Sequence, residues 1–180
     1  DVGDIKQDGY ADSLLWDEDR TTAYLLYGPA DQWTGNEPID QIAHTVIHLN
    51  GFWPLGQAAD IDGDGADDLL FQGAWLDDGF FTGGIQMIPG SPEVRAELTA
   101  GFGSTDGTIL IYTGGLAGVD VQVVDWDHDS EGRSDLLVSY GYATTGVKAA
   151  VFTGEQLYQD VISPHGSPLW SGSATVTVTG

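Results

Sequence analysis

One aspartate-rich motif occurs three times in the chain, and an apolar pair follows each copy. The shared form is D-x-D-x-D-G-x-x-D, and the copies start at Asp4, Asp60 and Asp125. The starts are separated by 56 and 65 residues. Because self-similarity at such a period is the signature of a repeat architecture, the sequence predicts three structural units. They are expected to span residues 1–56, 57–121 and 122–180.

Each unit also contains short segments rich in β-branched and aromatic residues, bounded by Gly, Pro, Asn or Asp. These features are typical of β-strands. In the middle unit the segments are 69–71, 85–90 and 108–112, and a further segment, 121–124, precedes the last motif. Four short strands in about 60 residues are typical of a β-propeller blade. The sequence therefore predicts an all-β protein with three four-stranded blades, either part of a propeller or completed by oligomerisation. An antiparallel sandwich is the alternative.

Two local expectations accompany this fold. The stretch from Ser91 to Leu98 has a capping serine, a proline at the first helical place and an early acid, which predicts one or two helical turns. Trp16 follows the first motif and aligns with Phe71 and Val138, so we expect it in the core.

The charge of the chain restricts what it can bind. The 180 residues include 28 acidic and 5 basic side chains, a formal net charge of −23. Such a chain repels nucleic acid and anionic membrane surfaces. No apolar run approaches the roughly 20 residues of a membrane-spanning helix, so no membrane insertion is expected. Leu, Ile, Val and Phe together make up 45 residues, or 25% of the chain, which is enough for a folded core.

Calcium explains the aspartates of the middle motif best. The ion takes six to eight oxygen ligands, and alternating Asp residues in a tight loop supply them. Position 12 of the loop is Phe71, so this is not an EF-hand, which needs an acid there. Asp67 is expected to point outward. The predicted ligands are Asp60, Asp62, Asp64, the carbonyl of Ala66, and Asp68. The alternative is an Asp-Gly turn without metal, in which four carboxylates within nine residues would repel one another.

The other two motifs depart from the middle one. In the last, two extra residues separate Asp129 from Asp135, which places the carbonyl ligand at Arg133, or at Gly132 if the loop bulges, and Glu131 is a substitute ligand. The predicted ligands of the last motif are Asp125, Asp127, Asp129, the Arg133 carbonyl and Asp135. We therefore expect two calcium ions per chain.

The first motif is degenerate, because Lys6 occupies the place of its second aspartate. An ammonium group there repels a divalent ion. We expect Lys6 to pair with Asp4, Asp8 and Asp12 in a metal-free loop. In the alternative, Lys6 extends into solvent and calcium binds with fewer protein ligands.

The motif, its apolar pair and the glycine-ended strand resemble FG-GAP/VCBS repeats, the units of integrin-α-type β-propellers. The stretch 60–70 is the most specific match, whereas 101–103 and 27–30 hold only fragments of the family's other signatures. The resemblance implies calcium in the loops between early strands of each blade. It also implies extracellular binding or scaffolding roles.

The predicted function is therefore a secreted or cell-surface, calcium-binding segment with an adhesive or scaffolding role. Its expected partners are other blades or copies of itself, with a glycan or a cell-surface protein as further candidates. The chain has no cysteine and no G-x-S-x-G, H-E-x-x-H or P-loop motif, so no enzymatic activity is predicted. A carbohydrate-binding propeller is the first alternative, and a polysaccharide-degrading enzyme is the second. The tryptophans that favour sugar binding by their position near turns are Trp33, Trp53, Trp75 and Trp170.

Overall fold

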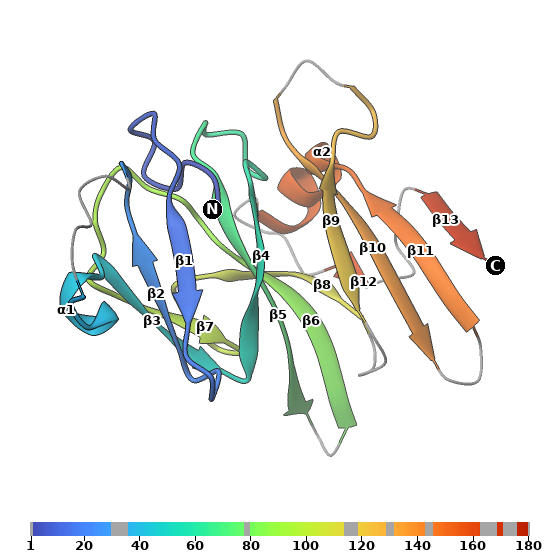
Figure 1. The fold of residues 1–180 in the computed structure, drawn as a ribbon. Helices are drawn as coiled ribbons and strands as arrows, with labels where there is room; N and C mark the ends of the chain where they lie inside the picture. Colours follow the sequence, from blue (N-terminus) through green and yellow to red (C-terminus); the bar gives the residue numbers. More distant parts are fainter. Residues whose placement is uncertain are drawn as a thin grey trace.

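The computed structural model describes residues 2–29, 36–77, 80–113, 119–128, 132–142, 146–162, 169–170 and 176–179. Within these ranges, thirteen strands form three separate sheets (Figure 1). The protein is therefore all-β, as the sequence predicted. None of the three sheets closes on itself in the part of the chain that is described.

We name the sheets A, B and C in chain order. Sheet A has the strand order β1 (Ser13–Trp16), β2 (Thr22–Leu26), β3 (Thr45–Asn50) and β7 (Glu97–Gly101). Sheet B has the order β12 (Leu169–Trp170), β8 (Thr108–Tyr112), β6 (Phe80–Ile88), β5 (Asp68–Asp77) and β4 (Phe52–Ala59). Sheet C has the order β13 (Val176–Thr179), β11 (Gly146–Phe152), β10 (Asp135–Tyr142) and β9 (Asp120–Val124).

Two strands, β7 and β12, do not join the sheet formed by the strands before and after them in the chain. β7 lies between β6 and β8 in the chain, yet it pairs in parallel with β3 of sheet A. β12 lies between β11 and β13, yet it pairs in parallel with β8 of sheet B. Sheets A and B therefore each end with a parallel strand that the following unit supplies, whereas the described strand pairs of sheet C are all antiparallel. The sequence predicted neither of these two strands, β7 and β12.

Helices are few among the described residues: α1 (Ile39–Ile42), α2 (Gly154–Leu157) and the π-helix η2 (Tyr158–Ile162). The helical turns expected between Ser91 and Leu98 were a wrong prediction, because this stretch bends and then enters β7. The helix forms instead at the corresponding place of the third unit, where the Thr153 side chain accepts a hydrogen bond from the Gln156 N–H. No helix in the described ranges has the length and apolar character needed to cross a membrane.

Two apolar clusters hold the three sheets together. In β5, Leu69 and Phe71 pack against sheet A, whereas Leu70 packs against sheet C. This alternation follows from the period of two along a strand. Sheet B therefore buries both faces, and sheets A and C each bury one.

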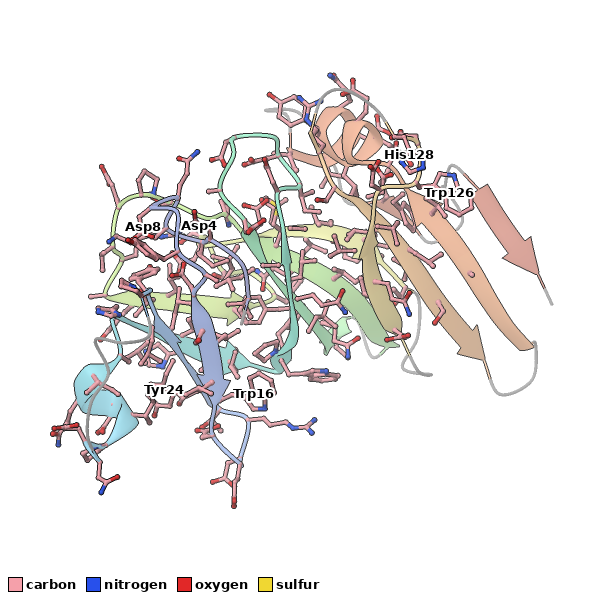
Figure 2. All side chains as sticks on the ribbon, turned by 45° about the horizontal axis from the view of Figure 1, so that its top comes forward. Asp4, Asp8, Trp16, Tyr24, Trp126 and His128 are labelled. Atoms are coloured by element: carbon pink, nitrogen blue, oxygen red, sulfur yellow. The ribbon has the colours of Figure 1, made fainter. Side chains whose placement is uncertain are left out.

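Trp16 is not in the core, contrary to expectation. It lies at the end of β1 with 46% of its surface exposed. Figure 2 shows Trp16 and Tyr24 toward the opposite end of sheet A from Asp4 and Asp8. Counted from the last aspartate of each motif, the residue that matches Phe71 is Leu15. The sequence alignment was shifted by one residue, and such a shift in a strand exchanges its two faces.

Candidate metal centre

The three motifs form loops at one end of the sheets (Figure 1). The loop 60–68 connects β4 to β5, and the loop 125–135 connects β9 to β10. The loop 4–12 leads into β1. The repeat thus places its aspartates at corresponding points of successive sheets.

The last aspartate of each loop, which we call the closing aspartate, is completely buried: Asp12, Asp68 and Asp135. In the middle loop, Asp68 Oδ2 accepts the N–H of Ile61 at 2.9 Å, and Oδ1 accepts the N–H of Gly90 at 2.9 Å. Asp135 makes the same pair of contacts, with Trp126 and Gly154. Asp12 accepts from Gly28 in the same way, and its loop-side donor is Lys6, one place further along the loop. The closing aspartate therefore joins its loop to the end of the second apolar strand of its unit.

This contact explains the glycine that ends that strand in every unit. A Cβ on Gly90 would lie 2.4 Å from the carbonyl oxygen of Asp67. At Gly28 and Gly154 it would lie 2.7 and 2.9 Å from the corresponding carbonyls of Ala11 and Ser134. Only glycine lets its N–H approach the carboxylate so closely. The sequence showed the glycine as part of the repeat but not its partner.

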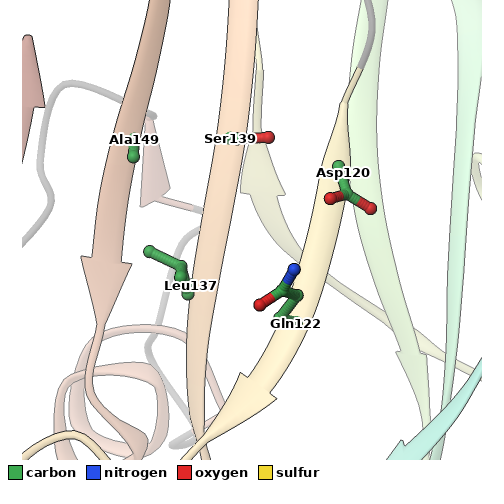
Figure 3. A pocket seen from close by; sticks show the side chains of 5 residues that line it. All are labelled: Asp120, Gln122, Leu137, Ser139 and Ala149. Carbon is green, nitrogen blue, oxygen red and sulfur yellow. The ribbon is translucent and has the colours of Figure 1, made fainter. Parts of the chain in front are cut away.

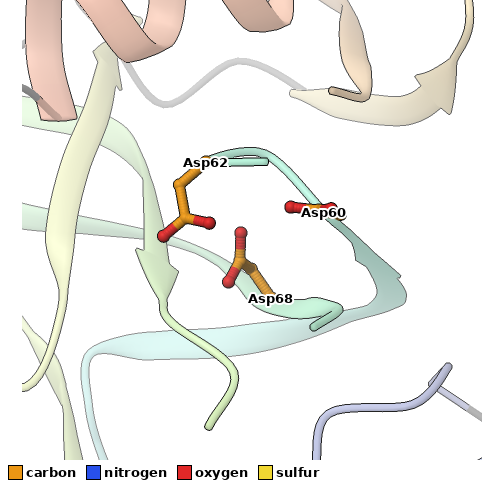
Figure 4. A group of neighbouring side chains, drawn as sticks. All are labelled: Asp60, Asp62 and Asp68. Atoms are coloured by element: carbon orange, nitrogen blue, oxygen red, sulfur yellow. The ribbon is translucent and has the colours of Figure 1, made fainter. Parts of the chain in front are cut away.

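In the middle loop, three carboxylates converge: Asp60, Asp62 and Asp68 (Figure 4). One oxygen from each lies within 4.8 Å of the others. Two oxygens bound to one calcium ion are at most about 5 Å apart, since each lies roughly 2.3–2.6 Å from it. The triad is therefore of a size that suits one calcium ion, and its oxygen chemistry suits a hard cation.

The neighbouring aspartates have other contacts. Asp64, a predicted ligand, is not part of this triad, and its Oδ1 accepts the N–H of Ala66 at 2.8 Å. Asp67 was expected to point outward, yet its Oδ2 accepts the N–H of Asp4 at 2.7 Å. The Asp67 N–H in turn donates to the Asp4 carbonyl at 3.1 Å. Asp67 therefore joins the middle loop to the first loop.

Burial makes the triad costly to ionise without a cation. Burial is the main cause that raises the pKa of Asp68 to about 7; backbone N–H hydrogen bonds oppose it, and the nearby Asp62 and Asp64 carboxylates add to the rise. Burial also raises the pKa of Asp62, and the neighbouring carboxylates of Asp64 and Asp60 add to the rise. A bound divalent cation would offset both effects by supplying positive charge.

Calcium binding is consequently expected to weaken as the pH falls. In the folded, metal-free protein the pKa of Asp68 is raised from an ordinary 3.8 to about 7. The raised pKa contributes stability that is complete below pH 3.8 and is lost as the pH rises through about 7. Because calcium needs the ionised carboxylate, affinity should rise steeply between about pH 6 and about pH 8. Calorimetric titration at the two pH values tests this, and equal affinities would contradict it.

The last loop contains a second triad, Asp125, Asp127 and Asp135, which meets the same 4.8 Å criterion. His128 Nδ1 lies 3.1 Å from Asp125 Oδ2 at a strongly exposed position. The predicted ligand Asp129 and the substitute Glu131 lie outside the described residues. Both predicted calcium sites therefore bring three carboxylates together.

Arg133, predicted to offer a carbonyl ligand, also uses its side chain to join two loops. Its Nε donates to the carbonyl of Asp62 at 3.3 Å, and its Nη1 pairs with Glu155 at 2.6 Å. Its guanidinium lies 4.2 Å from the centre of the Tyr158 ring. The next residue, Ser134, donates its N–H to the Asp60 carbonyl at 2.7 Å. Sequence reasoning missed this role, because no local pattern indicates which loop a side chain will reach.

The first loop has the hydrogen bonds of the middle loop without its triad. Asp4 Oδ2 accepts the N–H of Gly9, as Asp60 Oδ2 accepts that of Gly65. Asp8 Oδ1 accepts from Tyr10, two residues on, as Asp64 Oδ1 does from Ala66. Lys6 Nζ lies 3.1 Å from Asp8 Oδ2. We expected Lys6 to pair with Asp4, Asp8 and Asp12, and the ion pair of its ammonium is with Asp8.

The tryptophans considered for sugar binding form no common surface in the described structure. Trp53 is half-buried on β4. Trp33 lies outside the described residues, and the side chains of Trp75 and Trp170 are not described either. A different tryptophan, Trp126, is 51% exposed and follows Asp125 of the second triad.

No family model, curated protein or solved structure matches the chain.

Proposed function

We propose that the protein is a calcium-binding β-propeller segment of the FG-GAP/VCBS type, with an adhesive or scaffolding role outside the cell. The observation that carries this proposal is the recurrence of one acidic triad at corresponding places of two units. An isolated acidic cluster is common on protein surfaces. A triad repeated with the same buried closing aspartate is better explained by a shared ligand.

The arrangement of the sheets supports the propeller as the architecture. Successive sheets pack through their apolar faces, and the middle and last aspartate loops each connect two antiparallel strands. Blades of a propeller stack in this way around an axis. Calcium is the ion proposed to hold the middle and last loops in place.

The proposed role is binding, not catalysis, and the first test is a calcium count. Equilibrium dialysis with calcium should recover about two ions per chain, one for each triad. Magnesium should compete weakly, since it prefers rigid octahedral sites with several waters. Recovery of no calcium from the folded protein would overturn the proposal.

Replacement of Lys6 by aspartate is expected to create a third calcium site. The first loop already has the hydrogen bonds of the middle loop, and Lys6 occupies the place of Asp62. Lys6→Asp replaces an ammonium by a carboxylate beside Asp8 and Asp12. Titration calorimetry should then count one more ion per chain than in the wild type. If the count stays the same and only affinity rises, calcium already binds the first loop. Lys148→Asp, which makes the same charge change on β11, is the control.

One observation favours a sugar ligand as a second candidate. Trp126 is 51% exposed beside the second triad, so an aromatic surface and a candidate metal site lie next to each other. Aromatic rings stack on sugar faces, and the bound ion could hold hydroxyl oxygens. A glycan array probed with wild type and Trp126→Ala tests this candidate. Calcium-dependent binding that Trp126→Ala abolishes would support it, and no binding to any glycan would exclude it.

A further inference from the structure

Leu15 is exposed at a place that the other two units bury. Counted from the closing aspartate, Leu15 corresponds to Phe71 and Val138. Phe71 and Val138 are completely buried against the preceding sheet, whereas 51% of the Leu15 surface is exposed. Tyr24, which is opposite Leu15 in the register of β1 and β2, belongs to the same outer face of sheet A. This face therefore has apolar residues at the positions that contact the preceding sheet in the other two units.

On the outer face of sheet C, a residue is partly exposed that the other two units bury against the following sheet. Leu137 corresponds to Leu14 and Leu70, which are buried against the following sheet. Leu137 is only half-buried and lines an open pocket (Figure 3). The pocket residues all lie on this face: Asp120, Gln122, Leu137, Ser139 and Ala149. The face therefore has the residues that contact a following sheet.

Gln122 strengthens this comparison. It lies three residues before Asp125, as Gln57 lies three residues before Asp60. The Gln57 amide bonds the first strand of the following sheet, donating to the carbonyl of Val121 at 3.0 Å and accepting the N–H of Val123 at 3.1 Å. Gln122 points into the pocket instead, and no described residue bonds its amide.

A backbone hydrogen bond joins each pair of successive loops, and among the described residues it leaves one donor and one acceptor unused on the two outer faces. The residue before the closing aspartate donates its N–H to the first aspartate of the preceding loop, once from Asp67 to Asp4 and once from Ser134 to Asp60. The next acceptor in this series is the carbonyl of Asp125, and the corresponding donor of the first loop is the N–H of Ala11. Neither has a backbone partner among the described residues.

We propose that the outer face of sheet C binds the outer face of sheet A of a second copy, head to tail, through the contacts that join the sheets within one chain. Leu15 and Tyr24 of the second copy then cover Leu137 and Ala149. The two halves are different surfaces, so the interface is heterologous and can extend or close into a ring. This inference rests on the proposed blade architecture and adds its partner and residues.

The charge of the chain sets the conditions under which copies associate. Each copy carries −23, and two calcium ions reduce this to −19. Two such copies repel each other strongly at low ionic strength. In about 1 M salt the Debye length falls to roughly 3 Å, which screens most of this repulsion. Association is therefore expected with excess calcium at high salt and is expected to weaken as salt is removed.

The test uses one charged substitution on each face, Leu15→Asp and Leu137→Asp. Each variant loses one half of the interface and keeps the other. Sedimentation equilibrium in calcium and about 1 M NaCl should show association of the wild type and monomers of either variant alone. An equimolar mixture of the two variants should form a complex with one copy of each, because the intact faces are complementary. Val94→Asp is the matched control. Val94 is apolar and 53% exposed, and it lies on neither face, so this variant should associate like the wild type.

Several results would overturn the inference. A monomeric wild type would do so, as would a mixture of the two variants that remains monomeric. Dimers of Leu15→Asp alone would show that sheet C pairs with itself. Circular dichroism and a calcium count on each sample separate the inference from the proposed function. Two ions per chain without association contradict the interface alone, and association without calcium uptake contradicts the calcium proposal alone.

Discussion

Removal of calcium is expected to lower the melting temperature by about 5–10 °C for each site occupied at a hundredfold excess over Kd. An ion that binds only the folded state stabilises it by RT ln(1 + [L]/Kd), about 2.7 kcal/mol under these conditions. The triads should make this effect large, because they concentrate carboxylates around buried Asp68 and Asp135. Calorimetric melting in calcium and in EDTA measures the difference.

A pair of charge-neutralising variants assigns this effect to the middle site. Asp62→Asn removes a ligand charge but keeps an oxygen that can accept the Asp64 N–H. Most of the response due to this site should disappear. Asp40→Asn makes the same change at an exposed position in α1, and its response should equal that of the wild type. Equal melting of wild type with and without EDTA, with no metal recovered, would contradict the prediction.

Loss of a closing aspartate is expected to destabilise the protein even without calcium. Asp68→Ala leaves two buried N–H groups, of Ile61 and Gly90, without their acceptor. Each unsatisfied group costs about 1–3 kcal/mol, so the loss is about 2–6 kcal/mol. That is a large part of the roughly 5–15 kcal/mol that stabilises a typical domain. Denaturant unfolding in EDTA measures it directly.

Asp12→Ala separates this structural role from metal binding. Asp12 likewise accepts two backbone N–H groups, in the loop that contains Lys6. We expect a similar loss of stability, and calcium should not change it. A loss below about 1 kcal/mol in both variants would show that these hydrogen bonds do not hold the loops in place.

The fold class and much of the candidate site could be predicted from the sequence, because both depend on local patterns. The spacing of the aspartates placed Asp60, Asp62 and Asp68 in one loop, and the structure brings their carboxylates together. The segment 108–112 was predicted as a strand and is β8. Short segments with β-branched residues and clear boundaries retain their conformation in many contexts.

What the sequence did not show depends on contacts between distant segments. The stretch before β7 has helical start signals, but pairing with β3 draws 97–101 into a strand. Tertiary pairing overrides such weak local preferences. The side-chain contacts of Arg133 and Asp67 cross from one loop to the next, and no residue spacing encodes them. Trp16 was misplaced because Ser13 separates Asp12 from the apolar pair, so that an alignment on the apolar residues is shifted by one position.

The parallel strands supplied by the following unit have a consequence for the order of folding. β3 ends at Asn50, but its partner β7 ends at Gly101. During synthesis, sheet A therefore waits for about fifty more residues to leave the ribosome before its last edge is covered. Sheet B waits in the same way for Leu169 and Trp170. An uncovered edge can pair with another nascent chain. The net charge of −23 opposes such pairing, because it makes the chains repel one another. Repulsion between these charges is expected to keep neighbouring chains apart until sheets A and B have gained their final strands.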